Sequence, residues 1–360
     1  MDQFTFNNRA LPFAQRDISD ALPELLIARA GGGAPQDPVA AELLERDVTL
    51  ADIAAHYVGS VRGEAPASII TRAIGSADFG ESLVTAFSRV AITAFDAAVS
   101  GYDRLTVKIP VPDFKPVRLP HLSGADFVEQ PEHSEWRYSA PSTGVVLEAQ
   151  SAVLTQGTTA IVTREALLSD SAGQIAATAA EYGNTAALSI ASAIASALSS
   201  TANLDDGEPL FSATASIANL ITAGGAPSVT TLSAGATKLW RQPRAIGSVA
   251  GIAPAFLVIP PELIDAASTA LIQTFGDINS AKGNVDLVVL PHLVSTREWY
   301  LLGRPASAPV LGMLTLGSGS PLLVERVALP GGVDGIALRA RLDFRIVRLS
   351  RLGAFKNDGA

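Results

Sequence analysis

Cysteine is absent from the 360 residues of this chain. Its absence excludes disulfide bonds, thiolate nucleophiles and Cys-ligated zinc, and it fits a protein that assembles in a reducing cytoplasm. The folded protein is therefore held together by noncovalent interactions or by covalent links other than disulfides.

Charged residues are also sparse, at 17% of the chain against 48% hydrophobic residues. This composition indicates a folded chain that buries much of its apolar surface, some of it between subunits. No run of about 18 strongly apolar residues occurs, so we expect no membrane span. The first residues, MDQFTFNNRALPF, lack the charged and apolar regions of a secretory signal.

Basic residues are too few for a general nucleic-acid binder. The formal net charge is −9, whereas neutralising phosphates requires surplus Lys and Arg. An acidic protein can still surround DNA without adhering to it.

Residues that carry catalysis are few as well. The four histidines are His56, His121, His133 and His292. No two of them have the i, i+4 spacing that places ligands on one helical face. Asp205, Asp206 and Gly207 lack the later Glu of a calcium loop and predict a plain turn. The chain contains neither a nucleophile elbow nor a phosphate-binding glycine loop, so we expect no enzyme, no cofactor and no metal site.

Residues 1–64 differ from the rest of the chain. They hold ten acidic residues and five arginines, a net charge of −5, and a GGGAP break. Apolar residues between positions 39 and 61 recur at roughly helical spacing, which predicts one or two short amphipathic helices on an otherwise extended arm. A second helical pattern runs from Ser76 to Ser100.

Three further segments have distinct patterns. Residues 105–118 alternate apolar residues with Lys108 and prolines, which predicts an edge strand. Residues 119–160 are rich in Pro and Gly and predict an extended β-hairpin, which has too little core of its own and would pack on another subunit. Residues 163–200 predict a long helix with Gly173 and Gly183 as candidate bends.

The second half of the chain mixes short strands and helices and predicts an α+β domain. The expected elements are strands at 255–259, 285–290, 299–302 and 310–316, and a helix from 260 to about 275. Residues 322–327 and 336–346 should form long paired strands. Along the second of these, apolar residues alternate with a charged face that contains Arg339, Arg341, Asp343 and Arg345. A phase slip at 346–347 predicts a bulge or bend.

Six phrases carry a resemblance to a known family. They are SADFGESL (76–83), TQGTTAIVTREALLSDSAG (155–173), DGEPLFSA (206–213), FLVIPPEL (256–263), WYLLGRP (299–305) and ALRARLDFRIVRLSRLGAFKNDG (337–359). The chain resembles tailed-bacteriophage major capsid proteins of the Hong Kong 97 type fold, in particular the Mu-like major head subunit family and the capsid halves of protease–capsid fusions. The likeness spans roughly residues 65–358. The Ala- and Ser-rich helix departs from the family pattern, and so do residues 1–64, which could be a retained arm or a remnant of a scaffolding or protease region.

The resemblance implies an α+β, Hong Kong 97-like capsid fold with an N-terminal arm, a projecting β-hairpin, a long spine helix and an axial domain. The implied parts are an N-terminal arm or extension (1–64), the N-arm helix and first peripheral strand (65–118), the extended loop or E-loop (119–160), the peripheral domain with its spine helix (161–214), the axial domain (215–317), further peripheral strands (318–348) and a tail that returns to the axial domain (349–360).

The implied function is that of a major capsid protein. Such a protein self-assembles into pentamers and hexamers that form an icosahedral virion shell around packaged double-stranded DNA, in the host bacterial cytoplasm. Its partners would be further copies of itself, a portal protein, and scaffold, protease or decoration proteins, without sequence-specific DNA binding and without a membrane. The alternative is an encapsulin-like nanocompartment shell that encloses an enzyme cargo.

Candidate inter-subunit contacts are Trp136, Arg137 and Tyr138 in the hairpin, and Arg339, Arg341 and Arg345 on the long strand. Six basic residues between positions 339 and 356 oppose a single acid. They suit salt links across subunit boundaries, to the acidic arm or to hairpin glutamates, although a DNA-binding stripe is an alternative. Some members of this fold join a loop Lys to a neighbour's Asn, but residues 119–160 contain no Lys.

Overall fold

The described part of the chain forms two compact units. The computed structural model describes residues 11–29, 33–59, 66–99, 101–117, 120–123, 132, 142–145, 151–169, 173–214, 217–244, 248–276, 284–329 and 335–359. The first unit comprises Met1–Val99, Thr155–Leu188 and Ser320–Asp343, and the second comprises Ser100–Leu154, Ser189–Gly319 and Phe344–Ala360. Each unit is assembled from segments that are far apart in the sequence.

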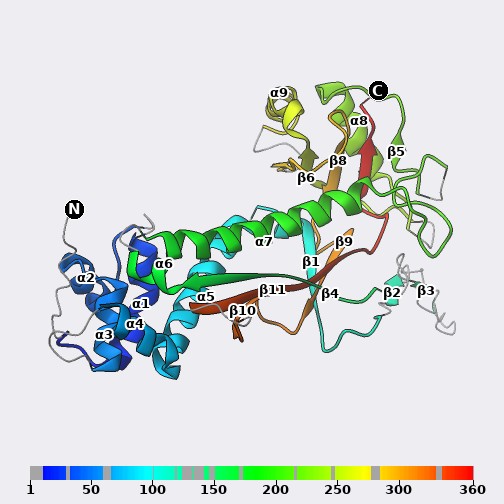
Figure 1. Ribbon diagram of the computed structural model, residues 1–360. Helices are drawn as coiled ribbons and strands as arrows, with labels where there is room; N and C mark the ends of the chain where they lie inside the picture. Colours follow the sequence, from blue (N-terminus) through cyan, green and yellow to red (C-terminus); the bar gives the residue numbers. More distant parts are fainter. Residues whose placement is uncertain are drawn as a thin grey trace. The chain divides into compact units, whose positions relative to one another are not determined.

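Five helices begin the first unit. They are α1 (Gln15–Arg29), α2 (Pro38–Glu45), α3 (Leu50–Val58), α4 (Pro66–Gly75) and α5 (Ala77–Val99). The side chain of Asp37 caps α2, and a reciprocal Thr49–Asp52 capping box begins α3. Helix α1 packs on α2 and α5, and α3 packs on α4 (Figure 1).

The expectation of an otherwise extended N-terminal arm is wrong for residues 15–29, which form α1, whereas α2 and α3 confirm the short helices predicted between positions 39 and 61. Ile18, Leu22, Leu25 and Leu26 of α1 are at most 1% exposed. This apolar face repeats every three or four residues, and a helix with such a face gains stability by packing it against a neighbour.

Helix α5 confirms the helical pattern predicted for 76–100. Residues 78–99 are long and apolar enough to cross a membrane by length and composition alone. However, Phe79, Leu83 and Phe87 are at most 1% exposed. The apolar face of this helix is thus covered by the protein itself.

The segment predicted as one helix at 163–200 forms two helices. They are α6 (Arg164–Ser169) and α7 (Gln174–Ser199), and Gly173 precedes α7 with φ = 70°. Gly183 lies inside α7, where an added Cβ would collide with the Ala91 carbonyl and the Phe95 amide of α5. Glycine therefore permits close packing of α7 on α5.

The strands of the first unit are β4 (Leu154–Thr163), β10 (Leu322–Val327) and the first part of β11 (Gly335–Arg348). Strand β10 pairs antiparallel with β11, with Glu325 opposite Arg339, and β4 also pairs with β11. The predicted bounds of β10 are confirmed, and the predicted alternation along β11 is confirmed by the burial of Leu338, Ala340 and Leu342.

The second unit contains a mixed sheet in the order β5-β12-β8-β6-β7. Its strands are β5 (Leu220–Ile221), β6 (Pro254–Ile259), β7 (Asp286–Val289), β8 (Trp299–Gly303) and β12 (Ala354–Asn357). Two helices pack with this sheet around Trp299, Leu301 and Phe355. They are α8 (Val229–Trp240) and α9 (Ile264–Phe275), and a short 3₁₀ turn at Pro261–Leu263 precedes α9. The strands and the helix predicted between 255 and 302 are confirmed.

The same unit contains a second set of paired strands. After a 3₁₀ turn (Asp103–Leu105), β1 (Thr106–Val111) pairs in parallel with β9 (Leu311–Leu316), which pairs antiparallel with the last five residues of β11. Strand β1 contains Pro110 and is the end strand in the order, which confirms the predicted edge strand. Of the bulge or bend predicted near 346–347, the bulge is wrong, because the register with β9 is regular through Arg348. The hydrophobic phase changes because both faces of this stretch are buried.

The base of the predicted hairpin is present. Strand β2 (Pro120–Ser123) pairs antiparallel with β3 (Ser142–Val145), and Ser123 stands opposite Ser142. Apart from residue 132, the segment between the two strands lies outside the described residues.

Candidate assembly surfaces

A charged face covers β10 and the first part of β11. Arg339 Nη1 lies 3.7 Å and Arg341 Nη1 3.8 Å from Glu325 Oε1, and Arg341 Nε lies 3.2 Å from Asp343 Oδ2. Asp343 is buried and accepts a 2.6 Å hydrogen bond from the Thr155 hydroxyl of β4. Two arginines, two acids and Thr155 therefore form a network across three strands.

This network leaves Arg339 accessible. Its side chain is 51% exposed, and those of Arg341 and Glu325 are 34% and 36% exposed. Ion pairs of this exposure each contribute at most about 1 kcal/mol to stability. Geometry and exposure together permit Arg339 to contact a second molecule while the strand pair stays folded.

The remaining predicted contact residues lie elsewhere. Arg345 belongs to the second unit, half-buried in the part of β11 that pairs with β9, where it stands opposite Leu314. Trp136, Arg137 and Tyr138 lie outside the described residues. The structure thus brings Arg339 and Arg341 together around one glutamate.

The six basic residues between 339 and 356 do not form one exposed stripe. Arg348 is 8% exposed and donates hydrogen bonds of 3.1 Å to Ser200 Oγ and the Ala202 carbonyl. Arg351 and Lys356 have side chains that are 6% and 12% exposed. The DNA-binding interpretation is therefore wrong for these three residues, which anchor the chain internally.

Arg351 holds the C-terminal segment against the 206–209 turn. It donates to the Asp206 carboxylate, with Nη2–Oδ1 at 2.9 Å, and to the Pro209 carbonyl at 2.8 Å. The hydrogen bond from Arg351 lowers the pKa of Asp206 below its usual value, against the opposing effect of burial. Gly207 takes φ = 82°, so the plain turn predicted there is confirmed.

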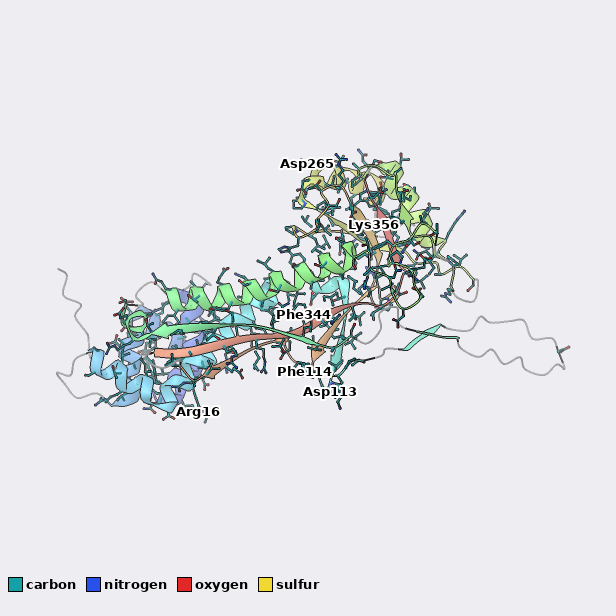
Figure 2. All side chains as sticks on the ribbon, turned by 45° about the vertical axis from the view of Figure 1, so that its right-hand side comes forward. Arg16, Asp113, Phe114, Asp265, Phe344 and Lys356 are labelled. Atoms are coloured by element: carbon teal, nitrogen blue, oxygen red, sulfur yellow. The ribbon has the colours of Figure 1, made fainter. Side chains whose placement is uncertain are left out.

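A second anchor involves Lys356 of β12, labelled in Figure 2. Its ammonium lies 2.9 Å from Glu298 Oε1 and over the ring of Tyr300. The Tyr300 hydroxyl donates to Glu298 Oε2 at 2.8 Å. Burial, and then the charge of Glu298, raise the pKa of Tyr300. The sequence alone did not predict either anchor. Its only indication was that Arg351 and Lys356 are isolated charged residues in apolar segments, and a charged side chain that is buried requires a partner.

Exposed apolar side chains mark further surface that sequence reasoning missed. In the second unit, Val294 is 88%, Ile272 of α9 70% and Phe114 49% exposed. Phe114 lies in the turn after β1, next to Asp113 (Figure 2). Covering these side chains with a second surface would remove apolar area from water, which favours association.

Nothing in the described ranges resembles a metal centre. No group of three or more His, Asp or Glu side chains there is arranged to hold an ion. His56 and His292 fall in the described ranges with side chains, whereas only the backbone of His121 is described and His133 is outside.

Comparisons with known proteins identify the family and the fold. The model of a family described as "Phage capsid protein" matches residues 148–357. No curated protein matches the chain in sequence. Among solved structures, a virus-like particle from Pyrococcus furiosus aligns with a TM-score of 0.50 and 11% identity, covering 75% of this chain and 97% of the other.

Two further structures are similar at lower TM-scores. The capsid of cyanophage P-SCSP1u has a TM-score of 0.46 and 13% identity, and the SrpI encapsulin of Synechococcus elongatus has 0.44 and 15%. Each covers 71% of this chain and 86% of the other.

The fold is thus of the α+β, Hong Kong 97-like capsid class. The family match covers more than half of the sequence, so the chain belongs to the phage capsid protein family. It is a phage capsid protein and thus a structural protein of the virion.

Proposed function

We propose that this protein forms pentamers and hexamers, which close into an icosahedral shell around double-stranded DNA in the host bacterial cytoplasm. The family match over residues 148–357 carries the proposal. The net charge of −9 permits it, because an acidic protein can surround packed DNA without adhering to it. A portal protein, and scaffold, protease or decoration proteins, would complete the particle.

Within this shell, residues 119–160 would be the extended loop that lies over a neighbour. The peripheral domain would comprise 161–214 and 318–348, and the axial domain 215–317. Pairing of β12 with β8 supports a tail at 349–360 that returns to the axial domain. Residues 1–64 and 65–118 would precede these parts as the N-terminal extension and the first peripheral elements.

Electron microscopy of the purified protein tests the assembly. We expect closed particles with fivefold and sixfold clusters of subunits. A protein that stays monomeric at high concentration would overturn the proposal. Polyvalent closure, in which many modest interfaces act together, gives such a shell its stability.

The inter-subunit contacts proposed are Trp136, Arg137 and Tyr138 of the loop, and Arg339, Arg341 and Arg345 of β11. For Arg339, the exposed half of the side chain supports the proposal. The experiment must separate a contact between subunits from the contact with Glu325 inside one subunit.

Exchanging the charges of Arg339 and Glu325 distinguishes the two kinds of contact. Arg339→Glu should lower the particle yield, and the double variant Arg339→Glu/Glu325→Arg restores opposite charges within the strand pair. If Arg339 serves a neighbour, the double variant should still assemble poorly. Its free energy of unfolding should stay within about 1 kcal/mol of wild type, because the swap loses only the partly exposed Arg341–Glu325 pair. Normal particle yield from the double variant would assign Arg339 to the subunit's own sheet and remove it from the interface.

A further inference from the structure

The N-terminal helices cover the long helix α5 of the same chain. Ile18, Leu22 and Leu25 of α1 are 0% exposed. On α5, Leu83 is 0% and Phe87 1% exposed. Helix α1 packs directly on α5, and α3 also contacts it (Figure 1). The apolar face of α5 therefore already has a partner.

Polar contacts fix the same packing. The Tyr57 hydroxyl of α3 donates to the Gln15 carbonyl of α1 at 3.0 Å and lies 3.1 Å from Ser82 Oγ of α5. Ser19 Oγ also lies 3.0 Å from Ser82 Oγ, and the Tyr57 ring meets Phe79 edge-on. One tyrosine thus joins three helices that span the N-terminal segment and α5.

The N-terminal segment also reaches the part of the chain that matches the capsid family. At Gly173, immediately before α7, an added Cβ would lie 3.0 Å from the Arg29 carbonyl at the end of α1. Helix α3 contacts α6 as well. Residues 164–174 belong to the matched range 148–357, whereas the N-terminal helices precede it.

We propose that residues 15–58 are a permanent part of each subunit and remain in the finished particle. The partner of the apolar face of α5 is the chain's own N-terminal segment, not a second copy of the chain and not a separate scaffold. Removal of the segment would expose the side chains of α5 that α1 covers and leave Ser82 without its two hydroxyl partners. All of these contacts lie within one chain, as a retained structural segment requires.

The first test uses assembled particles and so depends on the proposed function. Peptide mapping and intact mass of subunits from infectious or fully assembled particles should find residues 15–58. Subunits that begin beyond residue 58 would overturn the proposal.

The second test uses the unassembled full chain, so its outcome does not depend on shell formation. A site-specific protease sequence is inserted between Gly59 and Pro66, and the purified protein is cut there. We expect the two fragments to elute together and to unfold in one transition. Separation of the fragments under native conditions would overturn the proposal.

A matched pair of variants links that result to the buried face of α1. In the cut protein, Leu25→Ala should increase the fragment dissociation constant at least about tenfold, because a buried leucine is truncated. Asp20→Ala, on the exposed side of the same helix, should leave it unchanged. Equal constants for the two variants would show that the fragments are held by something other than this face.

Discussion

Arg351 and Asp206 form a hydrogen-bonded ion pair, with Nη2–Oδ1 at 2.9 Å, across 145 residues of sequence. The arginine side chain is 6% exposed and the aspartate side chain 42%. The guanidinium also donates to the carbonyls of Glu208 and Pro209. Only arginine has the planar set of donors that makes all of these hydrogen bonds at once, so any substitution loses some of them.

Arg351→Ala should lower the free energy of unfolding by about 2–3 kcal/mol, since a charge-assisted bond and the hydrogen bonds to two partly buried carbonyls are lost. Arg351→Lys should recover only part of this. Denaturant unfolding of the unassembled subunit measures both. The control is Arg46→Ala, which breaks an exposed i, i+4 pair with Glu42 and should cost no more than about 0.5 kcal/mol. Equal losses for Arg351→Ala and the control would contradict the anchor.

The same pair predicts a pH dependence. The pKa of folded Asp206 lies below its ordinary value of 3.8, so its contribution to stability is complete above that pH and is lost as the pH falls through the folded pKa. The stability difference between wild type and Asp206→Asn should therefore be constant near neutral pH and shrink in acid below pH 3.8. Unfolding free energies measured at a series of pH values check this, and a difference that grows in acid would contradict it.

The elements that sequence predicted best are those whose pattern depends only on local residues. Strand β6 is a short apolar run that ends before Pro260, and β10 is a short strand that follows Pro321. The assembly role followed from six phrases distributed along the chain. None of this required knowledge of which segments meet.

What sequence could not predict depends on partners distant in the chain. Residues 18–26 were not recognised as a core helix, because the face that α1 covers belongs to α5. Arg351 was grouped with Arg339 on one basic stripe, although one is buried beside Asp206 and the other is half exposed. Strand alternation assigns a side chain to a face of the sheet, but only the tertiary fold decides whether that face is covered.

Gly183→Val should destabilise the first unit. A side chain there collides with the Ala91 carbonyl and the Phe95 amide of α5, and overpacking against backbone costs about 1–3 kcal/mol or more. Asn184→Ala, one residue on and exposed, is the control and should be neutral or slightly stabilising in a helix. Thermal unfolding compares them, and an unchanged Tm for Gly183→Val would mean that α7 and α5 do not need this close approach.

Particles should contain no covalent links through the hairpin. Residues 119–160 hold no Lys, so one reactant of a Lys–Asn bond is missing there. Boiled particles on a denaturing gel should run as one monomer band. A ladder of covalent rings would contradict this expectation.

Shortening the hairpin should separate folding from assembly. Ser123 pairs directly with Ser142, so residues 124–141 can be replaced by Asn-Gly, the two-residue loop that suits a hairpin of this register. The variant should keep the unfolding transition of the unassembled subunit, because a two-stranded excursion rich in Pro and Gly buries little against its own chain. Shell closure should fail, because the replaced segment contains Trp136, Arg137 and Tyr138, residue types that most often dominate interface energy.

Thermal unfolding and particle counts by electron microscopy measure the two effects. Trp136→Ala/Tyr138→Ala in the full-length hairpin is the finer variant and should reduce particle yield without changing Tm. Normal particles in normal yield from the shortened chain would defeat the proposed contact. A shortened subunit that cannot fold would also defeat it, since the segment would then belong to the subunit's own core.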